Sequence, residues 1–278
     1  MIGWIGLLLG GLMGCVHKHT FVHQNMDREY YLYRPRSAAE NAPLLLMMHG
    51  YQGDALFYSR FVGVKKVARQ NGFVVAFPQG TKNHYGVTHW NAQLAFQELP
   101  SGPVDDIGFL TNLAQYLQET ESVDPNRTYA TGISNGGFMS YTLACTHPEV
   151  FKGVGSLIGT MSGETWRSCN MEVPVPIFQV SGSLDSRVPI DGSITMENGW
   201  GGAPHIHEVM AFWGEHNQCQ SHSTGRFTGN TTYIRYDDCA GEGRVLYYEV
   251  EDMEHWLPNP RKDGFGGFEE MWLFFEGE

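Results

Sequence analysis

The chain has 278 residues, of which 42% are hydrophobic and 17% charged, so it is long enough and apolar enough to form a large globular domain with a buried core. Asp and Glu (30) outnumber Lys and Arg (18), which gives a formal net charge of −12, and no run of basic residues occurs. This charge argues against a nucleic-acid partner, because binding of phosphates requires clustered Lys and Arg side chains.

The first 15 residues, "MIGWIGLLLGGLMGC", form an uncharged apolar segment that is too short to span a bilayer as a helix. We interpret residues 1–15 as a signal peptide and residues 16–278 as a single domain. The ending "LMGC" resembles the bacterial lipobox, which would make Cys15 the lipidated first residue of the mature chain. The segment lacks the usual Lys or Arg near Met1, so an ordinary signal peptide without lipid, or another start codon, is the alternative. With or without lipid, a signal peptide predicts an exported protein, and membrane contact is expected only through the lipid anchor of the first reading.

Four cysteines remain after Cys15, and an even number in an exported chain is typical of disulfides. Four cysteines allow three pairings, and the sequence alone does not choose among them. The pairs Cys145–Cys169 and Cys219–Cys239 would close the two short loops. Four buried free thiols are the alternative.

Several short apolar runs along the chain indicate strands. "HTFVHQ" and "EYYLYRP" are expected as edge strands joined by a turn at 25–27. Continuous rather than alternating apolar runs, typical of strands buried on both faces, follow as "PLLLMMHG" and then near 73–80, 127–134, 154–160, 177–182 and 244–251.

Helical patterns lie between several of these runs. Phe61, Val64, Val67 and Ala68 share one face of a predicted helix that ends at Gly72. Further predicted helices begin after 105–106, where either Asp can be the cap, and contain "GGFMSYTLAC", "IHEVMAFWGEH" and "FEEMWLFFE". The segment 220–243 is polar and glycine-rich, and we expect an excursion there that is tied by its cysteines. Strands that alternate with helices predict an α/β protein with a mostly parallel central sheet covered by helices on both faces.

The stretch "YATGISNGGFMS" contains the pattern Gly-x-Ser-x-Gly, with Ser134 as the serine. A strand-to-helix turn of this kind holds a nucleophilic serine above the sheet in hydrolases, although glycine is also common in ordinary turns. Ser134 follows a predicted strand and precedes a predicted helix, at the sheet edge where α/β proteins carry their sites.

A nucleophilic serine needs a base and an acid, which follow it in the order acid, then His. Asp185 comes directly after an apolar strand, and Asp191 is the second choice in the same loop. His255 follows a predicted core strand and precedes the last helix, whereas His205 and His207 form an H-x-H pair without further metal-ligand spacing. We therefore expect Ser134, Asp185 and His255 to be the catalytic residues, and we expect no metal.

Acyl transfer also needs hydrogen-bond donors for the developing oxyanion. One is expected to be the backbone N–H of Asn135, the residue after the nucleophile. "MMHGYQGDA" ends an early strand at His49–Gly50, which makes the N–H of Tyr51 the expected second donor.

Six blocks of the sequence, in order, resemble the esterases of the polyhydroxybutyrate depolymerase type, a group that includes feruloyl and acetylxylan esterases. They are "LLLMMHGYQGDA", "HWNA", "PVDDIGFL", "VDPNRTYATGISNGGFMSYTLAC", "SGSLDSRVPIDG" and "EHWLPNP". The resemblance runs from about residue 30 to the end of the chain. It implies an α/β-hydrolase fold, secretion, no cofactor, the same three catalytic residues and the two disulfides that close the short loops.

This chain departs from the family around the base, where the usual Gly-His-x-Trp-Pro is replaced by Glu254, His255, Trp256, Leu257 and Pro258. It also ends soon after its last predicted helix, without the separate polymer-binding domain that secreted depolymerases often carry.

We therefore expect feruloyl or acetyl esters of polysaccharide as substrates, with the rings of Trp90 and Trp256 stacking on a sugar or phenolic group. Core packing is the alternative for each ring. Hydrolysis of hydroxybutyrate oligomers, amide hydrolysis, and binding without catalysis remain the alternative functions.

Overall fold

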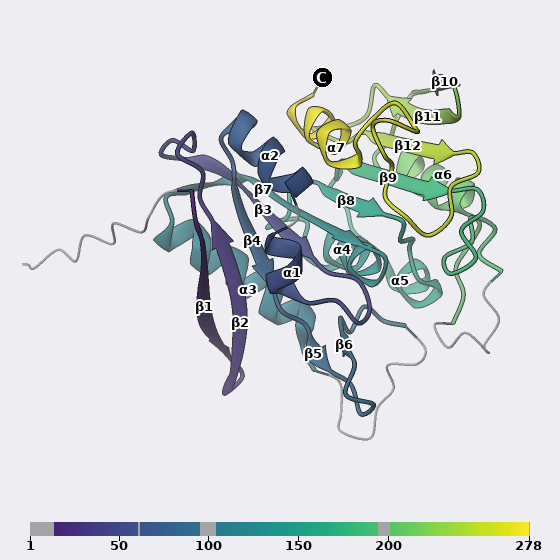
Figure 1. Ribbon diagram of the computed structural model, residues 1–278. Coiled ribbons are helices and arrows are strands. Elements are labelled where there is room, and N and C mark those ends of the chain that lie inside the picture. The colour runs from purple at the N-terminus through teal and green to yellow at the C-terminus, as the bar shows by residue number, and fades with distance from the viewer. Residues whose placement is uncertain (1–13, 61, 95–103, 194–200, 278) are drawn as a thin grey trace, which may run out of the picture.

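The computed structural model describes residues 14–60, 62–94, 104–193 and 201–277. Within this part of the chain, ten strands form one twisted sheet in the order β1-β2-β4-β3-β7-β8-β9-β12-β11-β10 (Figure 1). The strands are β1 Val16–His23, β2 Met26–Tyr33, β3 Ala42–Met48, β4 Val74–Pro78, β7 Val123–Ile133, β8 Val154–Leu157, β9 Ile177–Gly182, β10 Ser221–Thr228, β11 Thr231–Asp237 and β12 Val245–Val250. Two further strands, β5 Thr81–Lys82 and β6 Thr88–His89, form a separate small hairpin.

The middle of the large sheet is parallel, from β4 through β3, β7, β8 and β9 to β12, and both edges are antiparallel. The predicted apolar runs form these central strands. The predicted first hairpin is also present, but only β1 lies at the edge, because β2 pairs with β4 on its other side.

Helices cover both faces of the sheet, as the alternation of strands and helices predicts (Figure 1). They are α1 Ala55–Ser59, α2 Val62–Asn71, α3 Asp106–Thr120, α4 Asn135–Thr146, α5 Gly163–Ser168, α6 Ile206–His216 and α7 Gly267–Glu276. None of the helices in the described residues is long and apolar enough to cross a membrane. Phe61, predicted on the face of α2, lies outside the described residues.

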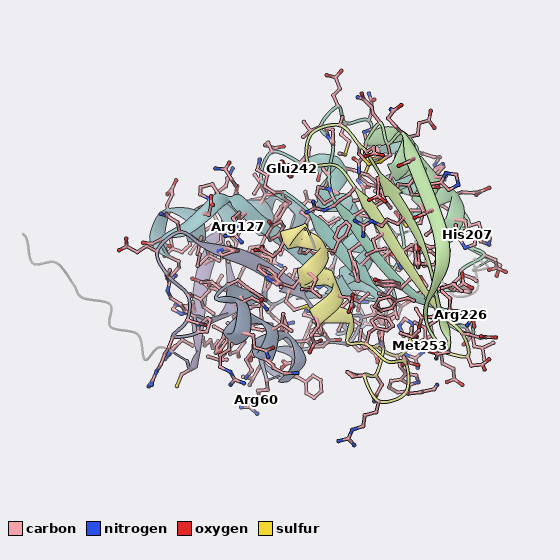
Figure 2. All side chains as sticks on the ribbon, turned by 90° about the horizontal axis from the view of Figure 1, so that it is seen from above. Arg60, Arg127, His207, Arg226, Glu242 and Met253 are labelled. Atoms are coloured by element: carbon pink, nitrogen blue, oxygen red, sulfur yellow. A yellow bond between two sulfur atoms is a disulfide. The ribbon has the colours of Figure 1, made fainter. Side chains whose placement is uncertain are left out.

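The core consists of two apolar clusters, one on each face of the sheet. Alternate residues of β3 enter different clusters: Leu44 and Leu46 pack with α3, α4 and α6, whereas Leu45 and Met47 pack with α2 and α7. Successive side chains of a strand point to opposite faces, so a strand buried on both faces must be apolar throughout. The unbroken run "PLLLMM" meets this requirement. Arg127, labelled in Figure 2, pairs with Glu276 at the carboxyl end of α7, with distances of 2.6 and 2.7 Å to its two carboxylate oxygens.

The segment 220–243, expected as an excursion tied by its cysteines, is regular in the structure, which the sequence did not predict. It contains β10 and β11, which extend the sheet beyond β12 as an antiparallel hairpin. Most side chains of β10 are exposed, so the strand carries polar residues and a glycine where a buried strand would carry apolar ones. Cys219 and Cys239 form a disulfide at the base of this hairpin.

A buried ion pair joins β2 to the start of α3. The Arg28 guanidinium donates to Asp106 Oδ1 at 2.6 Å, and both side chains are almost completely buried. Asp106 Oδ2 accepts the backbone N–H of Asn91 at 2.8 Å, and the guanidinium lies 3.8 Å from the centre of the Phe109 ring. Asp105, not Asp106, caps α3, with its carboxylate accepting the N–H of Gly108.

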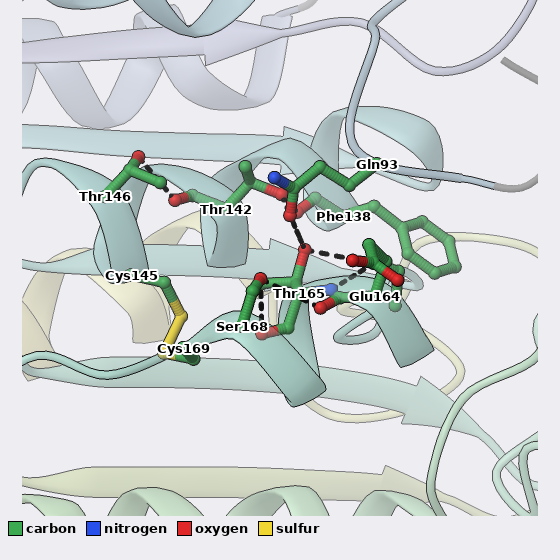
Figure 3. Close-up of a disulfide and its surroundings, with 10 residues drawn as sticks. Gln93, Phe138, Thr142, Cys145, Thr146, Glu164, Thr165, Ser168 and Cys169 are labelled. Atoms are coloured by element: carbon green, nitrogen blue, oxygen red, sulfur yellow. Dashed lines mark hydrogen bonds between the residues drawn. A yellow bond between two sulfur atoms is a disulfide. The ribbon is translucent and has the colours of Figure 1, made fainter. Parts of the chain in front are cut away.

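The second disulfide, Cys145–Cys169, ties the end of α4 to the end of α5 (Figure 3). The two helices are also joined by a hydrogen bond of 3.1 Å between the hydroxyls of Thr142 and Thr165, and Thr165 Oγ1 donates to Gln93 Oε1 at 3.0 Å. The structure thus contains both of the short-loop disulfides, and this one braces α4, the helix that directly follows Ser134.

Candidate active site

Ser134 lies at the sharp turn between β7 and α4, as its sequence context predicts. Its backbone has φ 54° and ψ −116°, a conformation that L-residues other than glycine rarely adopt. Ser134 is the cap residue of α4, yet its hydroxyl makes no capping hydrogen bond. The hydroxyl is therefore directed to another partner.

The two glycines of Gly-x-Ser-x-Gly are required by close backbone approaches. A Cβ on Gly132 would lie 2.2 Å from the carbonyl carbon of Gly136. A Cβ on Gly136 would lie 2.6 Å from the carbonyl oxygen of Met48 and 2.8 Å from that of His49. Any larger residue would force the turn away from the end of β3, where the loop that contains Tyr51 begins.

The structure brings Ser134, His255 and Asp185 together in one chain of hydrogen bonds. Ser134 Oγ lies 3.0 Å from His255 Nε2, and His255 Nδ1 lies 2.7 Å from Asp185 Oδ2. Because the carboxylate accepts, the imidazole proton lies on Nδ1, which leaves Nε2 to accept the hydroxyl proton of Ser134. This is the geometry of a serine nucleophile with its base and its orienting acid.

Asp185 is held in place by its own loop. Its second oxygen, Oδ1, accepts the backbone N–H groups of Arg187 and Val188, both at 2.9 Å. Asp185 follows β9 and His255 follows β12, and the two loops are joined where Leu184 N–H donates to Met253 O at 3.0 Å. Asp191, the second choice for the acid, instead accepts the N–H of Ser193 within its own turn.

The two residues expected to supply oxyanion donors lie on either side of Ser134. Asn135 is the first residue of α4, so its N–H belongs to the first turn, whose N–H groups have no acceptor within the helix and carry partial positive charge. Tyr51 follows Gly50, and a Cβ on Gly50 would lie only 3.5 Å from Ser134 Cβ. Both backbone positions therefore lie close to the serine.

Trp90 contradicts the expectation that its ring stacks on substrate. The residue is completely buried and packs on the ring of His49, with 4.9 Å between ring centres. Trp90 directly follows β6, and its ring lies in the interior. Trp256, in contrast, is 71% exposed. It lines an open hollow of about 500 Å³, which is formed by residues before and after His255 in the chain but not by His255 itself: Asp252, Met253, Glu254, Leu257, Asn259, Lys262 and Asp263.

The H-x-H pair has local partners in the fold. His205 caps α6 by accepting the N–H of His207 at 3.1 Å, and His207 lies 3.3 Å from a carboxylate oxygen of Glu249. Within the described part of the chain, no group of three or more His, Cys, Asp or Glu side chains is arranged to hold a metal ion.

Three functional features of this region lack a signal in the sequence. The side chain of Asn135 donates to Trp90 O at 3.1 Å and accepts Trp90 N–H at 2.7 Å. The indole of Trp90 donates to His49 O at 2.9 Å. The ring of His49 bonds the backbone of Gly50 and Gly80. The sequence motif "HG" indicates only the turn, because Gly80 and Trp90, which also bond His49, lie 31 and 41 residues away.

Known proteins resemble the chain in both sequence and fold. Feruloyl esterase B of Piromyces equi is 26% identical over 208 residues, which cover 73% of this chain and 38% of that protein. The poly(3-hydroxybutyrate) depolymerase of Ralstonia pickettii is 31% identical over 140 residues, covering 48% of this chain and 28% of that protein. The chain spans less than half the length of the curated relatives it matches.

The solved structure of acetyl xylan esterase from Aspergillus awamori superimposes with a TM-score of 0.70 at 17% identity, covering 94% of this chain and 99% of that one. This likeness identifies the fold as that of the α/β-hydrolases. The family model described as esterase, PHB depolymerase, matches residues 28–198, which is more than half of the chain. The chain therefore belongs to the polyhydroxybutyrate depolymerase-type esterase family.

Proposed function

We propose that the protein is an exported serine carboxylic-ester hydrolase that acts through an acyl-enzyme on Ser134. One observation carries the proposal: the hydrogen-bonded chain from Ser134 Oγ through the His255 ring to Asp185, with distances of 3.0 and 2.7 Å, in a member of an esterase family. Ser134 is the nucleophile, His255 the general base and acid, and Asp185 the group that holds the imidazole.

The reaction proceeds in two halves. Ser134 Oγ attacks the ester carbonyl carbon while His255 Nε2 takes the hydroxyl proton, and the N–H groups of Asn135 and Tyr51 stabilise the oxyanion. The carbon–oxygen bond to the alcohol breaks, and the alcohol leaves with the proton from His255. A water molecule then gives a proton to His255 and attacks the acyl group. Ser134 recovers this proton, and the carboxylic acid is released.

The substrate class we propose is a feruloyl or acetyl ester carried by a polysaccharide. Relatives named feruloyl esterase and acetylxylan esterase support this class. The exposed ring of Trp256 and the hollow that it lines offer a surface for a sugar or a phenolic ring. A hydroxybutyrate oligomer is the second candidate, supported by the relatives named poly(3-hydroxybutyrate) depolymerase and poly(3-hydroxyalkanoate) depolymerase.

Export is proposed from two observations. Both disulfides require an oxidising compartment to persist. The apolar segment before Cys15 has the composition of a signal peptide and ends in "LMGC". We propose one domain over residues 16–278 that is periplasmic, extracellular or anchored to the cell envelope by lipid on Cys15.

The test compares the wild-type protein with Ser134→Ala on methyl ferulate, acetylated xylan, a short hydroxybutyrate oligomer and a polymer film. We expect ferulate or acetate release by the wild type and a loss of several powers of ten in kcat in the variant. Efficient film clearing with negligible ferulate and acetate release would assign the depolymerase activity instead. Binding of these ligands without any turnover would identify a protein that has kept the fold and lost the chemistry.

A further inference from the structure

A network of hydrogen bonds lies directly behind the turn that contains Tyr51, and its centre is His49. The His49 ring is completely buried. Its Nε2 accepts the backbone N–H of Gly80 at 2.9 Å, and the Gln79 amide lies 3.1 Å away on the same nitrogen. A backbone N–H can only donate, so the ring proton lies on Nδ1, which donates to Gly50 O at 2.8 Å.

The carbonyl of Gly50 has a second donor, the backbone N–H of Gly53 at 2.9 Å. Gly50 C=O and Tyr51 N–H belong to one peptide unit, and no cis peptide occurs among the described residues. In a planar trans peptide the N–H points opposite to the C=O. The His49 ring and Gly53 N–H therefore fix the direction in which Tyr51 N–H points.

Trp90 extends the network to the other side of the site. Its indole N–H donates to His49 O at 2.9 Å, which fixes the peptide before Gly50. Its backbone N–H and C=O bond the side-chain amide of Asn135 at 2.7 and 3.1 Å. A single buried residue thus connects the turn of Tyr51 with the first residue of α4.

We propose that His49 and Trp90 are positioning residues that hold the N–H groups of Tyr51 and Asn135 in the direction of the oxyanion, without touching the substrate. The role rests on the proposed esterase function of the same site. Preorganised donors stabilise charge that develops in the transition state, and removal of one donor costs about 10² to 10³ in kcat. Misalignment of a donor that is still present should cost less, about 10- to 100-fold, and should leave the ground-state affinity largely unchanged.

Two substitutions at His49 distinguish the contribution of Nδ1 from that of Nε2. In His49→Asn the side-chain NH₂ can occupy the place of Nδ1 and donate to Gly50 O, whereas in His49→Gln the amide reaches the place of Nε2 instead. Because Nδ1 makes the orienting contact, we expect His49→Asn to keep more of kcat than His49→Gln, with KM changed less than threefold in both. Affinity for a trifluoromethyl ketone, which forms an oxyanion on the serine, should fall in parallel with kcat/KM.

Trp90→Phe keeps a buried ring and removes only the indole donor, and it provides an independent test if the His49 variants do not fold. Its matched control is Trp213→Phe, because Trp213 Nε1 is buried and has no hydrogen-bond partner in the described structure. The control for His49 is His23→Asn, a buried histidine on β1. We expect kcat to fall in Trp90→Phe and to remain at the wild-type value in both controls.

The outcomes distinguish failure of the positioning role from failure of the proposed esterase function. Equal activity of His49→Asn and His49→Gln, a change confined to KM, or unchanged ketone affinity would overturn the positioning role while the Ser134-dependent activity stands. A wild-type protein without Ser134-dependent ester hydrolysis would overturn the esterase function and with it this role.

Discussion

The indole of Trp256 stands next to the proposed base and is 71% exposed, so its ring area is available to a ligand. We expect Trp256→Ala to raise KM for methyl ferulate about 3- to 10-fold, the equivalent of about 0.5–1.5 kcal/mol of aromatic contact, with kcat nearly unchanged. Trp256→Phe should keep most of the affinity. Michaelis–Menten kinetics on methyl ferulate and on ethyl acetate check this, since the small aliphatic ester should be insensitive to the change. An equal rise of KM for both esters would indicate a general disturbance of the His255 loop.

Burial lowers the pKa of His49 from 6.5 to about 4, and this effect outweighs both its hydrogen bond to Gly50 and the charge of Asp54, which raise it. His89 nearby lowers it further. Between pH 6.5 and 4 the unfolded chain therefore binds a proton at His49 that the folded protein does not. The contribution to the free energy of unfolding is complete above about pH 6.5, falls by roughly 3 kcal/mol as the pH drops to about 4, and is then constant.

Urea unfolding of the wild type and of His49→Asn at several pH values between 4 and 7.5 measures this contribution. The variant should show a flatter decline of the free energy of unfolding over the same range. Parallel curves for the two proteins would mean that other groups account for the acid sensitivity.

At the level of single residues, the sequence predicts the candidates that local patterns identify. The flanking glycines identify Ser134, and the positions of Asp185 and His255 directly after two predicted strands identify the acid and the base. The catalytic role of all three stays a prediction. The role of Trp90 could not be predicted, because loop sequence does not determine whether a ring faces solvent or the interior. The proposed role of His49 could not be predicted either, because its partners Gly80 and Trp90 come close to it only in the folded protein.

Among the structural elements, β2 and α3 are joined by the buried pair of Arg28 and Asp106. Asp106→Asn would leave the Arg28 guanidinium buried without its counter-charge, and we expect a loss of about 3–5 kcal/mol in the free energy of unfolding. Glu29→Gln is the matched control, because Glu29 pairs with Lys18 at the surface, where ion pairs contribute about 0–1 kcal/mol. Urea denaturation at pH 7 compares them, and equal losses would show that burial of the first pair has no special effect.

The elements that the sequence predicts well are the central strands and the long helices, whose apolar patterns are set by burial. The β10–β11 hairpin is missed because an edge strand exposed to solvent needs no apolar alternation: polar residues such as Ser221 and Thr224 satisfy its backbone geometry equally well. The order of the strands also lies beyond local pattern, since β4 pairs between β2 and β3 through contacts distant in sequence.

On the scale of the whole molecule, residues 1–13 lie outside the described structure and Cys15 is exposed. The apolar segment that ends in "LMGC" predicts that Cys15 is the first residue of the mature protein and carries lipid. Intact-mass and peptide mass spectrometry of protein produced in a bacterial host should find a lipid-modified Cys15 in the membrane fraction. Cys15→Ser should shift the protein to the soluble exported fraction, and a mature N-terminus well beyond Cys15 would contradict the prediction.

Ser134 has a positive φ, a backbone conformation that favours glycine, whereas the proposed reaction requires the hydroxyl of a serine at this position. Glycine adopts this backbone conformation without the cost of about 1–3 kcal/mol that other residues incur, so Ser134→Gly should unfold at a higher temperature than Ser134→Ala, by an amount near 1 kcal/mol in stability. Differential scanning calorimetry of the two variants measures this, and equal melting temperatures would mean that the turn is relaxed. A lineage that no longer needed hydrolysis would gain stability by exchanging this serine for glycine. With Ser134 as the proposed nucleophile, selection for activity and selection for stability favour different residues at the same position.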